Sequence, residues 1–457
     1  KMSIFGNKKK VVTRMAPSPT GHLHIGTART ALFNYLFAKH AKGTFIMRTE
    51  DTDRERSRPE YETEILEGLT RLGLSWDAFY RQSERTAIYR QYLERAIKNG
   101  KAYLSKEESK MRPGEEIEVV RIKNPNVKIT FHDEVRGEIT FDTTELGDFV
   151  IARTLDDALY HFTVVVDDYE MQVTHVIRGE DHISNTPRQI LIQEAIGAER
   201  PIYAHLPLIL APDRSKLSKR HGAVMLEEYE RQGFIQPAIV NYLALLGWNP
   251  GTDQELYSME DLIHAFDLSG IQKSGAIFNI EKLEWFNREY LKSYSHKEFT
   301  AYVESVTQSR FTALSQYSDT RFARLLPILR ERTTSSAQLN REVEAGEYDF
   351  VFEAPHPSAD MIKWKKDTDI RQTLSRLQKV AELVARIPED ADVEEVKSYI
   401  WDYATEVGKG EVLWPFRVAL TGRERSPDPF MVAHIIGSAE AYNRVKTACD
   451  TILKASS

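Results

Sequence analysis

Two stretches of the chain combine residue types that suit a phosphate-binding site. In residues 13–30, Pro17, Pro19 and Gly21 exclude regular structure, and a helical pattern of apolar residues follows them. The stretch predicts a strand, a stiff loop and a helix N-terminus, whose free N–H groups and positive dipole end attract anions. His24, where the loop enters the helix, can donate a hydrogen bond to the same anion. The alternative is an ordinary proline-glycine loop with a capping or surface histidine.

The second stretch, residues 213–222, holds five basic side chains, two serines and a glycine. Its lysines are suited to clamp a polyphosphate from a mobile loop, although most such charge runs are solvated turns. The two stretches together predict a nucleotide site better than either does alone.

Composition narrows the class of protein. With 457 residues, the chain is long enough for three or four domains, and 41% hydrophobic with 28% charged residues is typical of a globular protein. The net charge of -7 argues against nucleic-acid binding driven by total charge, but local basic patches still neutralise phosphates. A single cysteine, Cys449, excludes a disulfide framework and a thiolate-rich metal cluster within the chain. No apolar run is long enough to span a membrane, and we expect a cytoplasmic protein.

The order of the elements behind these motifs predicts an α/β fold. Short apolar strands at residues 11–15 and 44–48 alternate with helical patterns, which favours a doubly wound, Rossmann-like parallel sheet. Ligands bind such sheets beyond the carboxyl ends of the strands, so the opening loop and Glu50 are expected to face one crevice. Two further apolar runs, at residues 160–166 and 173–178, are predicted as buried strands of the same sheet.

Two other parts of the sequence have different patterns of apolar residues and predict different secondary structure. Between residues 101 and 157, period-two apolar patterns on both sides of Asn124-Pro-Asn126 predict a small β-rich insertion with a hairpin at that turn. Past Pro237 the chain is predicted to be almost wholly helical. Its basic clusters are suited to an RNA backbone, although ordinary surface helices look similar. These clusters are Arg321, Arg324, Arg330 and Arg332, and Lys363, Lys365 and Lys366 around Trp364.

The two phosphate motifs carry a resemblance to a known class. His24-Ile-Gly-Thr27 and Lys216-Leu-Ser-Lys-Arg220 resemble the paired signatures, usually spelled HIGH and KMSKS, of class I aminoacyl-tRNA synthetases. The longer contexts resemble glutamyl-tRNA synthetases of the bacterial type. These contexts are Arg14-Met-Ala-Pro-Ser-Pro-Thr-Gly21, Glu50-Asp-Thr-Asp53 and Val176-Ile-Arg-Gly-Glu-Asp-His182. Related glutaminyl enzymes carry Pro-Glu-Pro-Asn-Gly at the position of the proline-rich loop. The resemblance is strong over residues 10–290 and looser in the helical remainder.

The resemblance and the residue patterns together imply a domain organisation. We predict a Rossmann-like catalytic domain at residues 2–100 and 156–215, an acceptor-end-binding insertion at 101–155, a tRNA stem-contact region with the basic loop at 216–293, and a helical anticodon-binding region at 294–457.

The resemblance also implies an activity, ATP-dependent ligation of L-glutamate to tRNA(Glu) through a glutamyl-adenylate, with Mg²⁺ on the phosphates of ATP. Catalytic or ATP-binding roles then fall on His24, Gly26, Thr27, Lys216, Lys219, Arg220 and Asp181. Lys219 is expected to be the chief cation at the leaving pyrophosphate. Asp181 is either an adenosine ribose contact or a helix cap.

Binding of glutamate is implied for a second set of residues. This set is Arg14, Ser18, Glu50, Tyr160 and Arg178, with Glu50 expected at the substrate ammonium. Arginine suits the carboxylate because it binds bidentately. The alternative for each arginine is a structural salt bridge, such as one between Arg14 and Glu50. Arg332 resembles an arginine that discriminating enzymes use at the third anticodon base.

Two departures from the family pattern affect these expectations. Some bacterial relatives carry a cysteine-rich zinc knuckle in the insertion, but this chain has no cysteine there, so we expect no zinc. The segment Thr163-Val-Val-Val166 places an apolar residue where certain relatives contact the substrate through a polar one. The predicted partners are tRNA(Glu), L-glutamate and ATP, with no membrane, and we expect a monomer.

The sequence can also be compared with four other functions. A non-discriminating synthetase would also glutamylate tRNA(Gln), and the truncated glutamyl-queuosine type would lack an anticodon-binding region. A nucleotidylyltransferase of small metabolites shares a similar first motif but does not account for the long helical C-terminal part. A pure RNA-binding module does not need both phosphate motifs.

Overall fold

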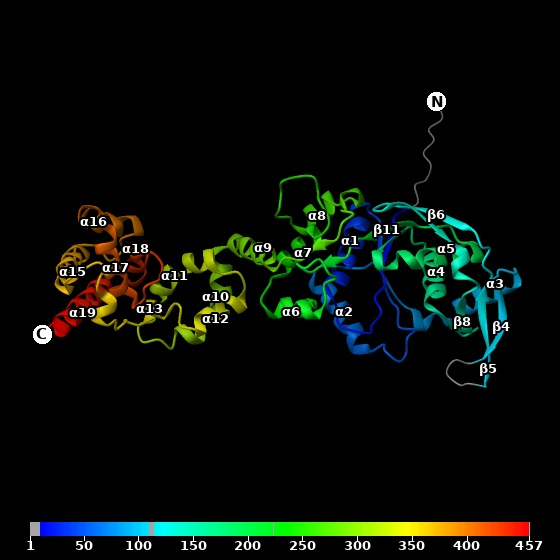
Figure 1. Cartoon of the computed structure of the whole chain (residues 1–457), viewed down its shortest axis with the longest axis horizontal. Coiled ribbons are helices and arrows are strands. Elements are labelled where there is room, and N and C mark those ends of the chain that lie inside the picture. The colour runs from blue at the N-terminus through cyan, green and yellow to red at the C-terminus, as the bar shows by residue number, and fades with distance from the viewer. Residues whose placement is uncertain (1–9, 109–113, 223, 457) are drawn as a thin grey trace, which may run out of the picture. The chain divides into compact units, whose positions relative to one another are not determined.

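The computed structural model describes residues 10–108, 114–222 and 224–456, except for the side chains of Lys219 and Gln308. Residues 2–9 of the predicted catalytic domain therefore lie outside the described residues. The chain divides into two compact units, Lys1–Asn287 and Arg288–Ser457, which we describe separately. Figure 1 shows the order of the elements along the chain.

The first unit is built on a parallel sheet in two adjoining parts. Strands β1, β2 and β3 pair side by side, and strands β10 and β11 pair in parallel next to them. The two parts meet where the backbone N–H of Thr174, just before β10, donates to the carbonyl of Val12 in β1 over 2.9 Å. The bounds of these strands are β1 Val12–Met15, β2 Thr44–Thr49, β3 Ala78–Arg81, β10 His175–Gly179 and β11 Ile202–Leu206. The predicted doubly wound α/β sheet is confirmed.

Helices connect and cover these strands, and short 3₁₀ helices end several of the connections. The α-helices of the first unit are α1 Ile25–His40, α2 Pro59–Arg71, α3 Thr86–Lys98, α4 Tyr160–Glu170, α5 Thr186–Ile196, α6 Leu226–Arg231, α7 Gln236–Leu245 and α8 Met259–Ala265. The 3₁₀ helices are η1 Gln82–Glu84, η2 Thr143–Leu146, η3 Glu180–Asn185, η4 Lys219–His221 and η5 Leu268–Gly270. Two-residue strands β12 Ile209–Leu210 and β13 Ala276–Ile277 pair in parallel.

The run at residues 160–166 is a helix, so its prediction as a strand was wrong. Helix α4 buries Phe162 and the three valines that follow it, and it packs against α5. A short, continuously apolar run does not distinguish a buried strand from a buried helix. The β-branched residues favour a strand locally, but burial on several sides of the helix overrides that preference.

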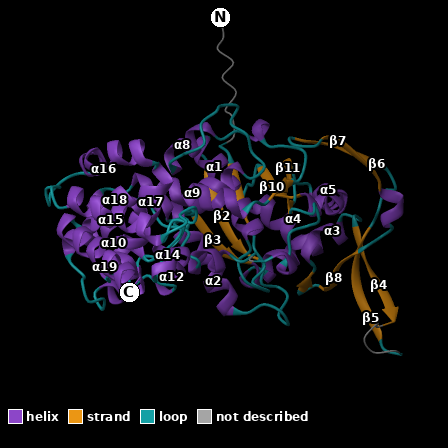
Figure 2. Cartoon of the chain, turned by 60° about the vertical axis from the view of Figure 1, so that its left-hand side comes forward, coloured by secondary structure: helices purple, strands orange, loops and turns teal. Residues whose placement is uncertain are grey.

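The inserted strands form two sheets, and the predicted hairpin at Asn124-Pro-Asn126 was also wrong. Strands β4, β5, β8 and β9 form an antiparallel sheet, whereas β6 pairs with β7 and, through Asp133 and Tyr203, with β11 of the main sheet. Figure 2 shows β4 and β5 as a separate ribbon. The bounds are β4 Ala102–Glu108, β5 Glu116–Ile122, β6 Lys128–Asp133, β7 Gly137–Asp142, β8 Val150–Thr154 and β9 Asp157–Ala158.

Asn124 explains why the chain crosses from one sheet to the other at this point. Its side-chain amide donates to the carbonyls of Thr143 and Gly147 over 2.6 and 3.1 Å, and its backbone N–H donates to Asp148. The turn is therefore anchored to the segment after β7 instead of closing β5 onto β6.

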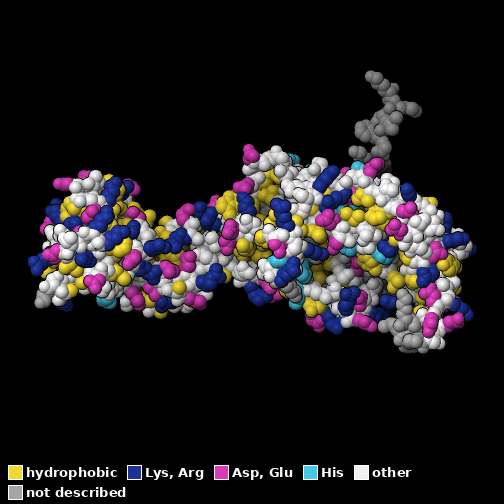
Figure 3. Space-filling model, viewed as in Figure 1, with side chains coloured by type: hydrophobic (Ala, Val, Ile, Leu, Met, Phe, Trp, Pro, Cys, Tyr) yellow, Lys and Arg dark blue, Asp and Glu magenta, His cyan; other side chains and the backbone are white. Residues whose placement is uncertain are grey.

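The second unit is helical, as predicted. Helix α9 Ile280–Ser293 crosses the boundary between the units. The remaining helices are α10 His296–Phe311, α11 Asp319–Arg332, α12 Ser336–Glu344, α13 Asp349–Phe352, α14 Ala359–Ile362, α15 Ile370–Val384, α16 Val393–Val407, α17 Lys409–Thr421, α18 Pro429–Ile436 and α19 Ser438–Ser456. Figure 3 shows basic and acidic side chains interspersed over the face of this unit that it draws.

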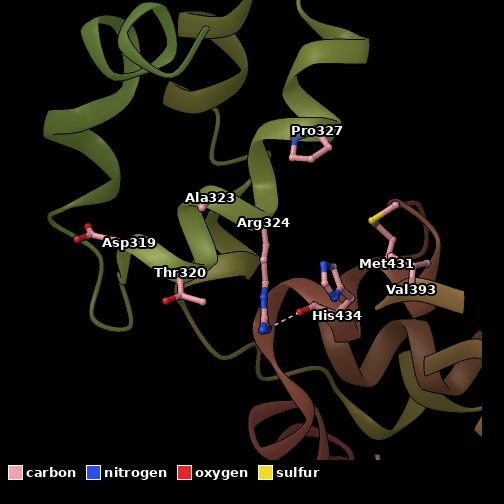
Figure 4. A pocket seen from close by; sticks show the side chains of 8 residues that line it. All are labelled: Asp319, Thr320, Ala323, Arg324, Pro327, Val393, Met431 and His434. Carbon is pink, nitrogen blue, oxygen red and sulfur yellow. Dashed lines mark hydrogen bonds between the residues drawn. The ribbon is translucent and has the colours of Figure 1, made fainter. Parts of the chain in front are cut away.

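Arginines on α11 hold this unit together. Arg324 donates to the carbonyl of His434 on α18 over 2.9 Å (Figure 4). It also donates to the carbonyl of Glu389 over 3.1 Å. It borders a shallow hollow of about 700 Å³ between α11 and α18. Arg321 donates to the carbonyl of Val351, and Arg330 to that of Lys292. These three side chains are half-buried, so much of the predicted RNA-facing cluster serves as internal hydrogen-bond donors.

Within the described residues, the structure contains no helix that is both long enough and apolar enough to cross a membrane.

We predict that Arg444→Met destabilises the helical unit by about 3 kcal/mol, because two buried carbonyls and the half-buried carboxylate of Glu440 lose a charged donor. Arg444 on α19 is 4% exposed and donates to the carbonyls of Phe350 and Leu420 and to Glu440. The measurement is urea unfolding of the full chain followed by circular dichroism. Lys446→Met, at an exposed position of the same helix, is the matched control. Equal stability of the two variants would contradict the prediction.

Candidate active site

A cavity of about 770 Å³ opens at the carboxyl ends of β1, β2 and β10. It lies where open α/β sheets bind their ligands. Ten of the residues predicted from the sequence line it, from both motif stretches and from the segments between them. They are Arg14, Ser18, His24, Gly26, Thr27, Glu50, Tyr160, Arg178, Asp181 and Lys216.

Backbone hydrogen bonds hold the two phosphate motifs together. The N–H of Ile25, the first residue of α1, donates to Val224 over 3.0 Å, and the N–H of Leu226 donates to Leu23 over 2.9 Å. The first motif is thus joined to the segment that follows the basic loop. His24 stands at the N-cap of α1 and is exposed, and a Cβ at Gly26 would meet no atom within 4 Å. The helix N-terminus is therefore open to an anion, as its predicted role requires.

The basic residues of the loop differ in whether they line the cavity. Lys216 lines it, and its Nζ lies 3.7 Å from a carboxylate oxygen of Asp181. Arg220 is exposed and donates within its own loop to His221 and Ser215 over 3.1 and 3.2 Å, and it is not among the lining residues. The side chain of Lys219 lies outside the described part of the chain, so its role stays a prediction.

A buried network of charges lies behind the part of the cavity that Arg14 and Glu50 line. Arg14 binds Asp168 of α4 through Nε and Nη2 over 3.1 and 3.3 Å. Arg48 of β2, fully buried, donates to Asp168 over 2.8 Å and to Glu50 over 3.4 Å. Arg14 therefore forms a structural ion pair, but with Asp168 rather than with Glu50. Burial disfavours the charge of Arg48, yet the surrounding carboxylates of Asp168, Asp167 and Glu50 raise its pKa.

Glu50 is the carboxylate of this network that faces the cavity. Its backbone N–H donates to the carbonyl of Pro17 over 2.9 Å, which ties the end of β2 to the proline-rich loop. Burial raises the pKa of Glu50 to about 7, although the nearby guanidinium groups of Arg48 and Arg14 act in the opposite direction. A cation bound beside Glu50 would favour its charged form.

Arg178 differs from Arg14 in having uncharged partners. Its Nε donates to His205, its Nη1 to Gln189 and its Nη2 to Thr186, over 3.1, 2.7 and 2.9 Å. Burial lowers the pKa of Arg178. Tyr160, at the start of α4, lies near it with its hydroxyl 3.3 Å from His182, and burial raises the pKa of Tyr160 to about 12.

Asp181 and Ser18 occupy the rim of the cavity. Asp181 makes no capping hydrogen bond to η3 or α5, so the structure gives no support to its reading as a helix cap. A Cβ on Gly179 would lie 2.4 Å from the Asp181 carboxylate, so a larger residue at this position would displace that side chain. Ser18 is exposed on the proline-rich loop, and its carbonyl accepts from Thr20.

Sequence reasoning missed the partners of the arginines. Asp168, Arg48 and His205 are buried, and none of them belongs to the site residues predicted from the sequence. One signal was present, since Asp167 and Asp168 interrupt the apolar run of α4. Acidic residues are almost never fully buried unless paired, so they pointed to nearby cations.

Arg332 lies in the other unit, at the end of α11. It is exposed, unlike the three other arginines of that helix, and its guanidinium lies 5.8 Å from the ring centroid of Tyr348.

Among the described residues, no group of three or more His, Cys, Asp or Glu side chains is arranged to hold a metal ion.

Comparison with known proteins agrees with this architecture. Residues 10–112 and 104–285 match the family model of the catalytic domain of class I tRNA synthetases (E and Q), and residues 289–449 match that of an anticodon binding domain. The fold and the site thus define a class I tRNA synthetase.

Individual relatives narrow the class. The chain is 41% identical to a glutamate–tRNA ligase of Aquifex aeolicus over 90% of this chain and 93% of that protein. It is also 38% identical to a glutamate–tRNA ligase of Carboxydothermus hydrogenoformans, over 95% of this chain and 99% of that protein. A crystal structure of a glutamate tRNA ligase from Elizabethkingia meningosepticum in complex with its amino acid superposes with a TM-score of 0.82 at 30% identity, covering 97% of this chain and all of that one. The chain therefore belongs to the glutamate–tRNA ligase family.

The sequence predicts that the charged form of Glu50 binds the substrate ammonium, and burial raises the pKa of Glu50 to about 7, so we expect the KM for L-glutamate to rise up to about tenfold per pH unit below pH 7. Above that pH the carboxylate is already ionised and the KM levels off. The measurement is the KM between pH 5.5 and 8.5. In Glu50→Gln the KM is high and this pH dependence disappears. Glu60→Gln, at an exposed position of α2, keeps the wild-type profile. A flat profile in the wild-type protein would refute the assignment.

Proposed function

We propose that this protein ligates L-glutamate to tRNA(Glu) at the expense of ATP, through a glutamyl-adenylate. The observation that carries the proposal is the single cavity that joins the N-terminus of α1, the basic loop, two arginines and Glu50. Such a cavity suits a triphosphate and an amino acid held next to each other. The names of the relatives, glutamate–tRNA ligases, point to the same reaction.

In the first step, an oxygen of the glutamate α-carboxylate attacks the α-phosphorus of ATP, and pyrophosphate leaves with the electron pair of the broken P–O bond. The reactants are both anions, so positioning and charge neutralisation supply most of the rate enhancement. His24, Gly26 and Thr27 at the helix N-terminus are proposed to hold the triphosphate, and Lys216 and Lys219 to stabilise the leaving pyrophosphate. Mg²⁺, when bound to the phosphates, supplies further neutralisation.

The substrate amino acid is proposed to lie against the charge network. Arg178 has no charged partner in the hydrogen bonds described above, so its charge is available to a substrate carboxylate. Glu50 faces the ammonium, and Tyr160 and Ser18 complete the pocket. Asp181 at the rim is placed for a ribose hydroxyl of ATP.

In the second step, the terminal 2′-hydroxyl of the tRNA attacks the carbonyl carbon of the adenylate, and AMP leaves. We assign the acceptor end to the insertion at residues 101–155, the stem to residues 216–293 and the anticodon to residues 294–457. Exposed Arg332 is the proposed contact to the third anticodon base.

Two other functions receive less support. The match of residues 289–449 to an anticodon binding domain argues against both the glutamyl-queuosine type and a nucleotidylyltransferase of small metabolites. A non-discriminating enzyme that also charges tRNA(Gln) has the same catalytic site, so only the choice of tRNA separates it from the leading proposal.

Aminoacylation of purified tRNA(Glu) and tRNA(Gln) with labelled glutamate tests the proposal. We expect charging of tRNA(Glu) alone, together with ATP–pyrophosphate exchange that depends on glutamate, measured with and without tRNA. Failure to charge either tRNA would overturn the proposal, and charging of both would make the enzyme non-discriminating.

We predict that Lys219→Ala slows ATP–pyrophosphate exchange by about 100-fold or more, because a cation at the leaving group acts mainly in the transition state. The KM for glutamate should change little, and the circular dichroism spectrum should stay as in the wild type. Lys98→Ala, at the exposed end of α3, is the matched lysine control. Wild-type exchange rates in Lys219→Ala would remove the role given to the basic loop.

A further inference from the structure

A fully buried histidine and aspartate lie directly behind Arg178. His205 and Asp133 are each 0% exposed, and their Nδ1 and Oδ2 atoms are 2.6 Å apart. Neither residue lines the cavity. An aspartate–histidine pair is costly to bury and needs a complete set of partners, so its position against a site residue requires an explanation.

The pair is built by the register of three adjacent strands. Arg178 of β10 lies opposite His205 of β11, and β11 pairs with β6 through Tyr203 and Asp133. The side chains form one row, in which Arg178 Nε contacts His205 Nε2 over 3.1 Å and His205 Nδ1 contacts Asp133. The row thus begins on an inserted strand and ends at the cavity.

Asp133 is itself held firmly by backbone donors. Its carboxylate accepts from the N–H of His205 over 3.1 Å and from the N–H groups of Val135 and Arg136, in the turn between β6 and β7, over 3.0 and 2.9 Å. Burial disfavours the charged carboxylate, but these hydrogen bonds, that of the His205 ring first among them, keep the pKa of Asp133 low. Asp133 is therefore a fixed, ionised acceptor for the imidazole.

The contacts determine the state of the His205 ring. Arg178 Nε is a donor only, so His205 Nε2 must offer a lone pair. The ring proton then lies on Nδ1 and is donated to Asp133. Burial also lowers the pKa of His205, which agrees with an uncharged ring.

An uncharged acceptor leaves the charge of Arg178 intact. Arg14 donates to the carboxylate of Asp168 and is largely neutralised there, whereas no carboxylate lies within 4.0 Å of the Arg178 guanidinium among the described residues. The imidazole lies between Arg178 and Asp133. Because Asp133 holds the ring in place, the ring orients the Arg178 guanidinium without forming an ion pair with it. Arg178 is thus the oriented, uncompensated cation of the amino-acid pocket.

We propose that Asp133 and His205 are positioning residues that orient Arg178 without neutralising it, so that the pocket binds a side-chain carboxylate in preference to a carboxamide. The proposal rests on the proposed function, which places glutamate beside Arg178. It assigns specificity to two buried residues that do not touch the substrate, one of them on an inserted strand.

The test compares variants of His205 by the KM for L-glutamate and the KM for ATP in pyrophosphate exchange. His205→Leu removes the acceptor, and we expect the glutamate KM to rise about 10- to 100-fold while the ATP KM stays within about twofold, as for loss of a charge-assisted hydrogen bond. His205→Gln keeps an acceptor near the position of Nε2 and should restore most of the loss. In His205→Leu, the inhibition constant for L-glutamine should rise by a smaller factor than the KM for L-glutamate.

Asp133→Asn provides a second variant for the case in which His205→Leu does not fold. The amide lacks the charge that fixes the ring proton on Nδ1, so we expect the glutamate KM to rise about 3- to 10-fold, again without a matching rise for ATP. His175→Leu, at the far end of β10, is the control and should leave both KM values unchanged.

The outcomes separate this inference from the proposed function. Wild-type protein that shows no glutamate-dependent exchange or charging would overturn both. An active wild-type protein with an unchanged glutamate KM in His205→Leu, or in Asp133→Asn where the former does not fold, would overturn the positioning role alone. A fall in kcat with both KM values unchanged would show a merely structural role and would also overturn it.

Discussion

The buried ion network of Arg14, Arg48 and Asp168 is the constraint on which the rest of the site depends. Arg48 is fully enclosed and can stay charged only because carboxylates from α4 and from the end of β2 surround it. Loss of one partner from such a pair costs about 3–5 kcal/mol, because the other charge remains buried and unpaired. The network therefore fixes α4 against β1 and β2, and with them two walls of the cavity.

The same network makes Arg14 and Arg178 different, although the two arginines look equivalent in the sequence. Arg14 forms an ion pair with Asp168, whereas Arg178 donates to His205, Gln189 and Thr186 and to no carboxylate. Glu50 completes this arrangement, since the burial that makes its ionisation costly also makes it responsive to a bound cation. The pocket thus presents one available positive charge and one carboxylate whose ionisation depends on what it binds.

The sequence predicted what local chemistry determines and missed what distant pairs determine. Pro17, Pro19 and Gly21 excluded regular structure by their own geometry, and the helix that follows them begins at Ile25 as expected. In contrast, Asp168 is 154 residues away from Arg14, and Asp133 is 72 residues away from His205, so no local pattern connects them. The prediction of a strand at residues 160–166 was wrong for a related reason, since burial of α4 by other elements overrode the local preference of its β-branched residues. Ten of the residues that line the cavity were therefore predictable, whereas the only sequence signal for their supporting partners was the acidic pair Asp167 and Asp168.

The basic loop is attached at both ends. The N–H of Leu217 donates to Ile209 over 3.0 Å, and Val224 accepts from Ile25 over 3.0 Å. A chain spans at most about 3.3–3.6 Å per residue, so the short segment between these anchors has a small radius of travel. The two tethers enclose Lys219 and Arg220 but not Lys216, so any movement of these two cations is bounded by the same pair of backbone hydrogen bonds.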